Sequence, residues 1–350
     1  MHEKILSALS TVKYPGFDKD IVTLGMVEEV SVKSGAVHVN MKKLTAGDDT
    51  KNALAREIGH AVSELGFSAK VVFAGSASSD ALPPPHHEMP PKKEIKDVKY
   101  IVPVASGKGG VGKSTTAVNL SVTLARQGLR VGLLDLDVYG PSIPTMLGLE
   151  ERHAISKDQK LKPAEKHGLK VVSVGLLMEK GAALIWRGPI VAKMVKQLIY
   201  DVEWGELDYL VLDLPPGTGD VQITMLQSVP ISGAMVVTTP QDVALNDASK
   251  AINMFSKTET HVLGIVENMS FFICPHCGKG SEIFGKGGGK RESERTGVPL
   301  LGQIPLEGKI TQTGDSGKPI ALEDGPVAEI FRGIALKVTE SLKTAPLTAG

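Results

Sequence analysis

The chain has 350 residues, of which 42% are hydrophobic, and its 39 basic and 39 acidic side chains cancel to a net charge of zero. This length predicts two domains, and the composition is that of a globular protein with a sizeable core. The balanced charge argues against a protein that coats nucleic acid or an anionic membrane, and no apolar run approaches the roughly 18 residues that cross a bilayer. The amino-terminal segment has no apolar centre or cleavage site of a secretory signal, so we expect a cytoplasmic protein.

Residues 1–74 predict a small α+β domain. Apolar residues at helical spacing predict a short helix through Ile5 and Leu9 and a second helix over Ala53–Leu65. Two segments beside a serine–glycine turn read as strands: Met26–Val32 and Ala36–Met41.

Residues 75–97 predict a linker between two domains. Small residues and prolines dominate this segment, and it has few large apolar residues with which to build a core. His86 and His87 lie within it, where we expect them to be solvated rather than to bind a metal.

Residues 98–343 alternate short apolar strands with helical segments, which is the pattern of a doubly wound α/β domain with a mainly parallel sheet. Most of the expected strands lack the alternation of apolar and polar residues, as is typical of strands buried on both faces of a sheet. The expected strands are Tyr100–Ala105, Val131–Leu136, Lys170–Val174, Tyr209–Leu214, Ala234–Thr238, Val262–Val266 and Pro299–Ile304. Helical spacing predicts helices over Ser114–Gln127, Val191–Tyr200, Val243–Phe255 and Val327–Leu342. Pro103 falls inside the first strand although proline cannot donate to a sheet, and residues 344–350 are expected to form a frayed tail.

A phosphate-binding loop follows the first of these strands and opens the first helix. The segment from Gly107 to Ser114 matches G-x-x-x-x-G-K-[ST], in which glycines let backbone N–H groups turn towards phosphate oxygens. We expect Lys113 to reach the β- and γ-phosphates as a catalytic cation and the Ser114 hydroxyl to bind Mg²⁺. The predicted ATP-binding residues of this loop are Gly107, Lys108, Gly109, Gly110, Val111, Gly112, Lys113, Ser114 and Thr115.

The loop carries a second lysine, Lys108, directly after its first glycine. This cation is not needed to hold the nucleotide before reaction. It is either a solvated loop lysine or a group that neutralises phosphate charge across a dimer interface, as an arginine finger does.

Carboxylates at the ends of two strands complete the predicted site. Asp135 and Asp137 end the second strand, and Asp213 ends the apolar run before a Pro-Pro-Gly-Thr-Gly loop. Because ligands bind at the carboxyl ends of strands in this fold, we expect Asp135 and Asp213 on the Mg²⁺ side and Asp137 to position the attacking water. Acidic residues at strand ends also serve as helix caps, which is the alternative interpretation.

The nucleotide base is predicted to be adenine. Guanine-specific enzymes of this class usually carry an Asn/Thr-Lys-x-Asp box, and the sequence has none. Asn268 follows the strand at 262–266 and is a candidate adenine contact, although asparagine is also common in turns.

The two cysteines of the chain stand together as Cys274-Pro275-His276-Cys277, which favours a reducing compartment and one special thiol pair. Spacing alone leaves three uses open. A zinc site needs two further ligands, and His276 between the cysteines would be a strained third. A redox disulfide favours the start of a helix, whereas this segment reads as a loop. An iron–sulfur cubane needs four thiolates, and two chains related by a two-fold axis would supply them.

Together these motifs resemble the Mrp/ApbC family of iron–sulfur cluster carrier ATPases, within the deviant Walker A class that includes MinD and ParA. The motifs that carry the resemblance are Gly107–Thr115, Asp135–Ser142, Trp186–Pro189, Asp213–Asp220, Glu267–Met269 and Cys274–Cys277. Residues 1–73, with the segment Asp20–Met26, resemble a small domain that also occurs in other iron–sulfur assembly factors.

The resemblance implies a homodimer with ATP at its interface, in which Lys108 acts on the nucleotide of the opposite subunit and Asp137 aids hydrolysis. It also implies that Cys274 and Cys277 of each subunit hold a labile [4Fe–4S] cluster, which passes from scaffold proteins to apo-proteins. Relatives of the first domain often have a cysteine after a Leu-Thr segment, whereas Leu44–Gly47 has none. For that domain we therefore expect a role in docking targets rather than thiol chemistry.

A second class of function stays open, a MinD/ParA-like positioning ATPase with a structural zinc site. Such proteins bind a membrane through a terminal amphipathic basic helix, or they bind DNA. Residues 327–342 read instead as a packed final helix, and the neutral charge counts against DNA, so we expect neither partner. An electron-donating reductase related to nitrogenase iron protein is disfavoured because its ligand cysteines lie far apart in the chain.

Overall fold

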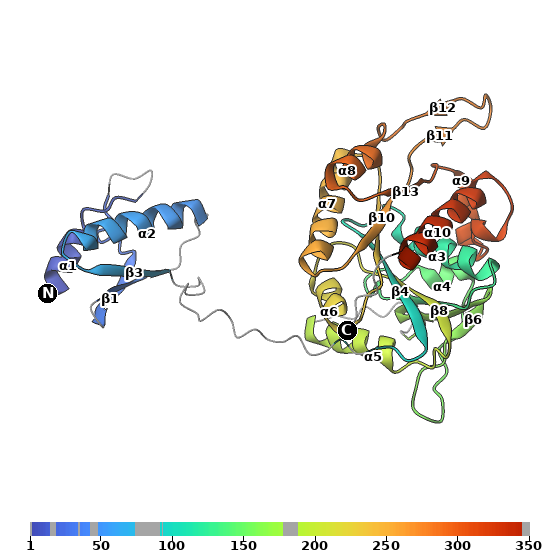
Figure 1. The fold of residues 1–350 in the computed structure, drawn as a ribbon, viewed down its shortest axis with the longest axis horizontal. Helices are drawn as coiled ribbons and strands as arrows, with labels where there is room; N and C mark the ends of the chain where they lie inside the picture. Colours follow the sequence, from blue (N-terminus) through green and yellow to red (C-terminus); the bar gives the residue numbers. More distant parts are fainter. Residues whose placement is uncertain are drawn as a thin grey trace. The chain divides into compact units, whose positions relative to one another are not determined.

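The computed structural model describes residues 2–14, 19–33, 36–42, 48–73, 92, 94–177 and 188–344. Contacts divide the chain into two units, Met1–Glu88 and Met89–Gly350, shown as ribbons in Figure 1. Most of the predicted linker, with His86 and His87, lies outside the described residues, as do Leu44–Gly47, Trp186 with Arg187, and residues 345–350 of the predicted tail. Ile95, which falls in the predicted linker, is buried in the core of the second unit.

The first unit contains the predicted helices and strands and one strand that the pattern did not predict. Its elements are α1 (His2–Leu9), β1 (Val27–Lys33), β2 (Ala36–Met41), α2 (Asp48–Ser63) and β3 (Ser68–Phe73). β2 is the central strand, antiparallel to β1 and parallel to β3, and its inward residues Val37 and Val39 are fully buried with Ile58 of α2. In β3 only Phe73 is buried, so the strand has no strong apolar pattern.

The second unit is built on one twisted sheet of eight strands in the order β13-β10-β9-β4-β8-β5-β7-β6. Every pairing is parallel except that of β6 with β7, which confirms the doubly wound α/β fold. The strands are β4 (Val98–Ser106), β5 (Val131–Asp135), β6 (Ala164–Lys166), β7 (Leu169–Ser173), β8 (Leu207–Asp213), β9 (Ala234–Thr238), β10 (Val262–Glu267) and β13 (Leu300–Gln303).

Helices cover both faces of this sheet, as Figure 1 shows. The α-helices are α3 (Lys113–Arg126), α4 (Ile143–Leu147), α5 (Gly188–Tyr200), α6 (Asp220–Ser228), α7 (Asp242–Lys257), α8 (Gly288–Thr296), α9 (Gly308–Asp315) and α10 (Pro326–Thr344). One core lies under α3 and α10, and a second core lies under α5, α6 and α7. All residues of β5 and β9 are buried, which explains why these strands read as continuous apolar runs. None of the helices within the described ranges is long and apolar enough to span a membrane.

Pro103 is accommodated at the centre of the sheet by the uneven lengths of its neighbours. It lies opposite Leu212 of β8, and β4 pairs with β9 only from Val104 onwards. Two residues earlier, the N–H of Ile101 donates to the Ser232 hydroxyl rather than to a strand. Because alternate residues point their N–H to the same side, Pro103 faces an edge where β9 has not yet begun to pair.

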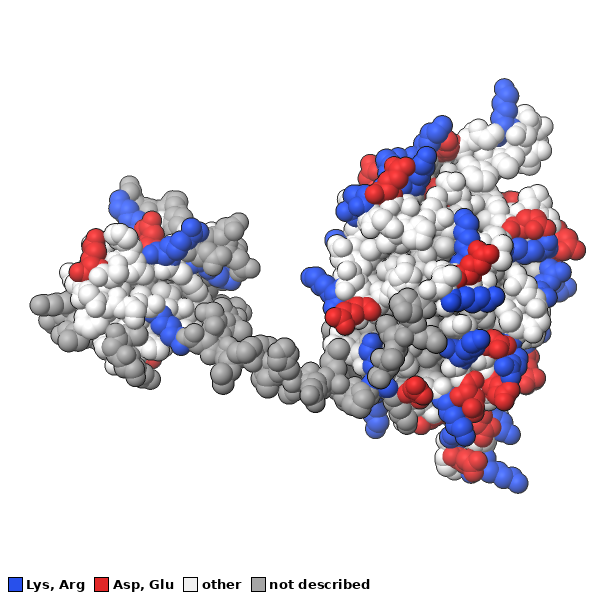
Figure 2. All heavy atoms as spheres, viewed as in Figure 1, with Lys and Arg blue, Asp and Glu red and all other residues white. Residues whose placement is uncertain are grey.

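A short hairpin extends from the top of the second unit in Figure 1 and carries both cysteines between its strands β11 (Phe272–Ile273) and β12 (Gly280–Ser281). It follows β10, so it starts at the carboxyl edge of the sheet, the edge on which the loop between β4 and α3 also lies. The face shown in Figure 2 carries basic and acidic side chains interspersed rather than one large area of either sign.

Candidate functional site

The phosphate-binding loop connects the buried end of β4 to the first turn of α3, as predicted. Gly112 has a φ of 88°, and a Cβ built on it would lie 2.0 Å from the Asn268 amide nitrogen. A Cβ on Gly107 would lie 2.1 Å from the carbonyl carbon of Asp247 in α7. Only glycine fits at these two positions, because the loop is held between α7 and the segment after β10.

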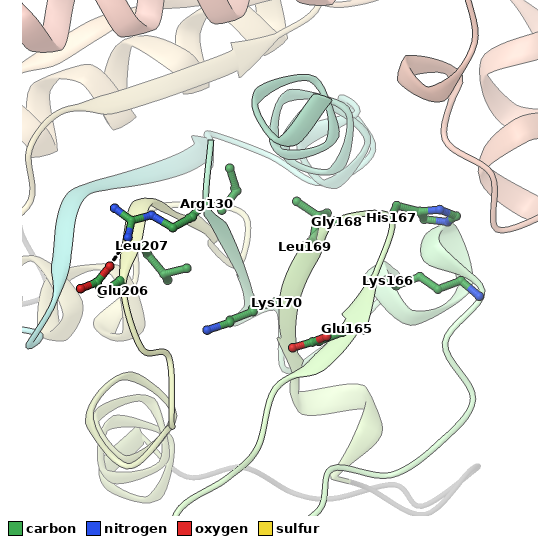
Figure 3. A pocket seen from close by; sticks show the side chains of 10 residues that line it. Arg130, Glu165, Lys166, His167, Gly168, Leu169, Lys170, Glu206 and Leu207 are labelled. Carbon is green, nitrogen blue, oxygen red and sulfur yellow. Dashed lines mark hydrogen bonds and ion pairs between the residues drawn. The ribbon is translucent and has the colours of Figure 1, made fainter. Parts of the chain in front are cut away.

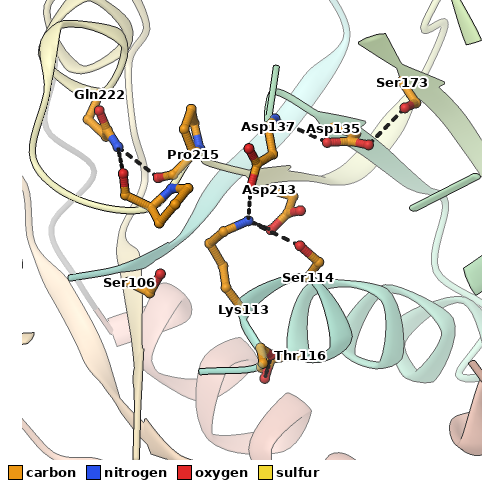
Figure 4. A network of polar contacts seen from close by, with 12 residues as sticks. Ser106, Lys113, Ser114, Thr116, Asp135, Asp137, Ser173, Asp213, Pro215 and Gln222 are labelled. Carbon is orange, nitrogen blue, oxygen red and sulfur yellow. Dashed lines mark hydrogen bonds and ion pairs between the residues drawn. The ribbon is translucent and has the colours of Figure 1, made fainter. Parts of the chain in front are cut away.

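The Lys113 ammonium lies at the centre of the site, between the ends of β5 and β8, where the sequence predicted carboxylates (Figure 4). Its Nζ is 2.7 Å from Asp213 Oδ1, 3.5 Å from Asp137 Oδ2 and 3.1 Å from Ser114 Oγ. Asp213 is fully buried and the Lys113 side chain is 6% exposed. The structure therefore brings Lys113, Ser114, Asp137 and Asp213 together in one buried polar cluster.

Three neighbouring strands end side by side at this cluster. In register, Asp135 of β5 lies opposite Asp213 of β8 on one side and opposite Ser173 of β7 on the other. The Ser173 hydroxyl donates to Asp135 Oδ2 at 2.7 Å, and the Asp137 N–H donates to Asp135 Oδ1 at 3.1 Å. Both oxygens of Asp135 thus accept a hydrogen bond from the protein, although we predicted this residue as a Mg²⁺ ligand.

The pKa values of the two strand-end carboxyls are raised. Burial, reinforced by the charge of Asp213, raises the pKa of Asp135 to about 7, against the hydrogen bonds from Ser173 and Asp137. Burial also raises the pKa of Asp213, with the charge of Lys113 opposing it. Within the described chain, Asp213 Oδ2 is a buried oxygen without a hydrogen-bond partner. An unpartnered carboxylate oxygen close to a serine hydroxyl is a donor set that suits Mg²⁺.

The glycine loop after Asp213 is tied to the phosphate-binding loop. The N–H of Gly217 donates to the carbonyl of Ser106 at 2.8 Å, and the Ser106 hydroxyl donates to the carbonyl of Lys108 at 2.9 Å. The Gln222 side chain donates to the carbonyl of Pro215 at 2.7 Å and is buried. Sequence analysis did not identify Ser106, Gln222 or Ser173, since none belongs to a recognisable motif position.

Asn268 and Lys108 take different positions around the loop. The Asn268 amide donates to the carbonyl of Val111 at 2.9 Å, so this side chain supports the loop itself. Contact of Asn268 with adenine stays a prediction. The Lys108 side chain is partly exposed, and its ammonium has no hydrogen bond or ion pair within the ranges that the structure describes. It is therefore available to a group outside the chain.

The cysteine hairpin presents two thiols at the end of a turn. Cys274 donates its N–H to the carbonyl of Lys279, and the N–H of Gly278 donates to the carbonyl of Cys274. Cys277 is exposed and Cys274 is half-buried. The backbone N–H groups of Cys277 and His276 and the Cys277 thiol point at the Cys274 sulfur and lower its pKa. Such a turn favours a thiolate, the form that binds metal.

The two cysteines have no third metal ligand among the residues that the structure describes. Among residues that the structure describes, no group of three or more His, Cys, Asp or Glu side chains lies together in a way that would hold a metal ion. His276 does not complete a site with the two thiols. In the described part of the chain, the hairpin therefore offers two thiols and no further metal ligand.

A separate hollow of about 410 Å³ lies at the opposite edge of the sheet (Figure 3). It is lined by residues at the amino ends of β5, β7 and β8, among them Arg130, His167 and Lys170. Arg130 forms ion pairs with Glu206 and Asp208, and Lys170 donates to the carbonyl of Trp204. The charges of Arg130 and Glu206 are thus paired with each other or with neighbours, and the hollow lies away from the carboxyl ends where ligands bind in this fold.

Comparisons with known proteins match both units. The model of the family described as NUBPL iron-transfer P-loop NTPase matches residues 97–339, and a model described as iron-sulfur cluster assembly protein matches residues 2–72. The iron-sulfur cluster carrier protein of Deinococcus radiodurans is 41% identical over 351 residues, covering 99% of this chain and 97% of that protein. The iron-sulfur cluster carrier protein of Escherichia coli K12 is 50% identical over 251 residues, covering 71% of this chain and 68% of that protein.

Solved structures are similar to the second unit. A nucleotide-binding protein from Archaeoglobus fulgidus in complex with ADP is 39% identical with a TM-score of 0.58, covering 66% of this chain and 90% of that one. The cell division ATPase MinD of Pyrococcus furiosus is 22% identical with a TM-score of 0.53, covering 69% of this chain and 98% of its own, and shares the fold. The family model spans well over half of the chain and the Deinococcus protein matches nearly all of it, so the chain belongs to the family of NUBPL iron-transfer P-loop NTPases.

Proposed function

We propose that this protein is an iron–sulfur cluster carrier that holds a [4Fe–4S] cluster between two copies of the chain and delivers it to apo-proteins, with ATP binding and hydrolysis. The observation that carries the proposal is the half site at the hairpin, where Cys274 and Cys277 are presented to solvent without a third ligand from the described chain. A cubane cluster needs four thiolates, and a two-fold axis through the hairpin supplies them.

The distribution of exposed apolar side chains supports a homodimer through this edge of the second unit. Large apolar side chains are exposed in several segments that follow the carboxyl ends of the parallel strands, and Tyr139 and Val243 are 72% and 68% exposed. The others on this edge are Leu177, Ile223, Ile273 and Ile283. Apolar groups gathered around a site are typical of a surface that another protein covers.

For hydrolysis, the N–H groups of the phosphate-binding loop and the amino terminus of α3 would bind the phosphates, and Lys113 would move from the carboxylates to the β- and γ-phosphates. Ser114 and Asp213 would hold Mg²⁺, which neutralises phosphate charge when bound. Asp137 lies beside Lys113 and would orient the attacking water. Lys108, whose ammonium is free of partners in the described chain, would neutralise phosphate charge in the opposite subunit.

The test is anaerobic reconstitution with iron and sulfide, with visible absorbance, iron content and oligomeric mass read on the same sample. We expect a brown dimer with about four irons, and loss of that iron in Cys274→Ala and in Cys277→Ala. His276→Ala is the matched control in the same turn and should keep the cluster. A colourless protein that holds one zinc per chain and releases it in His276→Ala would overturn the proposal.

Delivery is tested separately, by mixing the reconstituted dimer with an apo-enzyme that needs a [4Fe–4S] cluster for activity. The activity of the recipient should return faster than with free iron and sulfide, and should not return with the Cys277→Ala variant. Deleting residues 1–74 tests the first unit as a docking domain, since it should slow delivery and leave reconstitution unchanged. ATP-dependent co-sedimentation with liposomes or DNA would instead favour a positioning ATPase.

A further inference from the structure

We propose that Ser173 and His153 are positioning residues for hydrolysis, which hold Asp135 and, through it, the turn that carries Asp137. This inference rests on the proposed ATPase activity. Neither residue belongs to a motif in the sequence, and neither is expected to touch the nucleotide.

The Asp135 side chain is held by hydrogen bonds on both of its oxygens. It is fully buried, and its two oxygens accept from different parts of the chain, Oδ2 from the Ser173 hydroxyl and Oδ1 from the Asp137 N–H. The second of these bonds ties the backbone of Asp137, two residues beyond the end of β5, to the Asp135 side chain. Asp135 therefore acts on Asp137 through the main chain, while Asp213 and Ser114 remain beside Lys113.

Two hydrogen bonds fix the orientation of the Ser173 side chain. Its hydroxyl is fully buried, accepts from the N–H of Gly175 at 3.0 Å and donates to Asp135 at 2.7 Å. A hydroxyl has one proton, and here the N–H of Gly175 uses an acceptor position, so the proton is directed to Asp135. Alanine at this position would leave a buried oxygen of Asp135 without a donor and free its side chain to rotate.

His153 supports the backbone of Ser173. The antiparallel partner β6 pairs with β7 only as far as Val171, so the strand end at Ser173 has no strand on that edge. Instead, the Ser173 N–H donates to His153 Nε2 at 3.0 Å. Since Nε2 accepts, the imidazole proton is on Nδ1, which is buried without a hydrogen-bond partner in the described part of the chain. Burial lowers the pKa of His153, which keeps the ring neutral and Nε2 an acceptor.

These contacts form one chain from the loop after α4 to the turn of Asp137: His153, Ser173, Asp135 and Asp137. Outer partners of this kind typically change activity or metal affinity by 10–100-fold when they are removed. We expect the effect to fall on kcat, because the chain of contacts ends at Asp137 and not at the phosphate-binding loop.

The experiment compares full-length Ser173→Ala, Ser173→Thr, His153→Ala and His153→Gln with the wild type. Threonine keeps a hydroxyl donor, and glutamine keeps an acceptor at the place of Nε2. We expect the alanine variants to lower kcat about 10–100-fold. The KM for ATP should stay within about twofold of the wild-type value. The same should hold for the Mg²⁺ concentration at which a fluorescent ATP analogue is half-maximally bound. Ser173→Thr and His153→Gln should restore most of kcat.

Ser121→Ala is the matched control, because Ser121 is another fully buried serine of this unit, with its hydroxyl bonded to the carbonyl of Ala117 in α3. It should leave kcat unchanged. Binding of the analogue also shows that each variant is folded. Unchanged kcat in Ser173→Ala, a loss that threonine does not restore, or an equal loss of nucleotide binding would overturn the inference. A wild type that binds ATP without hydrolysing it would contradict the proposed function instead, before any variant is compared.

Discussion

Removing the ammonium of Lys113 should destabilise the second unit by an amount that depends on pH. In Lys113→Ala the fully buried Asp213 loses the cation 2.7 Å from its Oδ1, and it must either stay charged without a partner or take up a proton. Breaking a buried pair from one side typically costs about 3–5 kcal/mol. The alternative, protonation of Asp213, sets an upper limit on this loss of stability. Binding a proton at pH 7 to a carboxyl with an ordinary pKa of about 3.9 costs about 4 kcal/mol.

The same reasoning gives the sign of the pH dependence. Loss of Lys113 raises the pKa of Asp213 further, since the lysine charge is the main influence that opposes burial. The variant therefore binds this proton at a higher pH than the wild type does, and its deficit in the free energy of unfolding shrinks as the pH falls. At pH 5, which is closer to the ordinary pKa of the carboxyl, protonation costs only about 1.5 kcal/mol, and this is the upper limit on the loss of stability. The wild type should thus be more stable than the variant by about 3–4 kcal/mol at pH 7 and by no more than about 1.5 kcal/mol at pH 5.

The free energy of unfolding is measured without nucleotide, by urea titration at pH 5, 6 and 7 with tryptophan fluorescence. Trp204 is a suitable reporter because it is 1% exposed in the core of this unit. Lys250→Ala is the control, since its ammonium is 3.0 Å from Asp247 on the surface with 69% of the side chain exposed, and such pairs contribute about 0–1 kcal/mol. Equal deficits for Lys113→Ala at pH 5 and pH 7, or no deficit at all, would refute the reasoning.

Three further outcomes follow from the site. Gly112→Ala should weaken binding of a fluorescent ATP analogue at least about tenfold. The backbone φ of 88° is strained for alanine, and its Cβ would lie 2.0 Å from the Asn268 amide nitrogen, so the loop must move. Normal affinity would show that the loop tolerates a side chain. In Cys277→Ser, the rate of alkylation of Cys274 by iodoacetamide should rise with a pH midpoint below the ordinary pKa of a thiol, because backbone N–H groups lower the pKa of Cys274. A midpoint at or above about 8.5 would contradict this. Lys108→Ala and Asp137→Ala dimers should each be inactive, and an equal mixture that exchanges subunits should regain about a quarter of wild-type ATPase activity. The reason is that half of the dimers are then mixed, and one of the two sites in each mixed dimer is complete. No recovery would place Lys108 in the site of its own subunit.

The fold of the second unit could be predicted because its signals are local. Strands buried on both faces read as apolar runs, and the helices that follow them have apolar residues at helical spacing. The predicted boundaries of the strand at 234–238 agree with β9, and the boundaries of the other strands predicted for this unit differ from the observed ones by one or two residues. β3 and β6 were not predicted, because β3 buries only Phe73 and β6 none of its residues, so neither has a strong apolar pattern.

Around the site, the sequence by itself determined the phosphate-binding loop, because the chemistry of a glycine-rich loop between a strand and a helix is encoded in eight consecutive residues. It also indicated the carboxylates, because they stand at the ends of apolar runs. Only the tertiary structure decided which groups those residues contact. The order β8-β5-β7 is not the order of the chain, and it places Asp213, Asp135 and Ser173 side by side although they are far apart in sequence. The hydrogen bond of Ser173 with Asp135 depends on strand ends that meet in space, and that of Ser173 with His153 depends on a loop that lies beside a strand end. No periodicity within one segment records them.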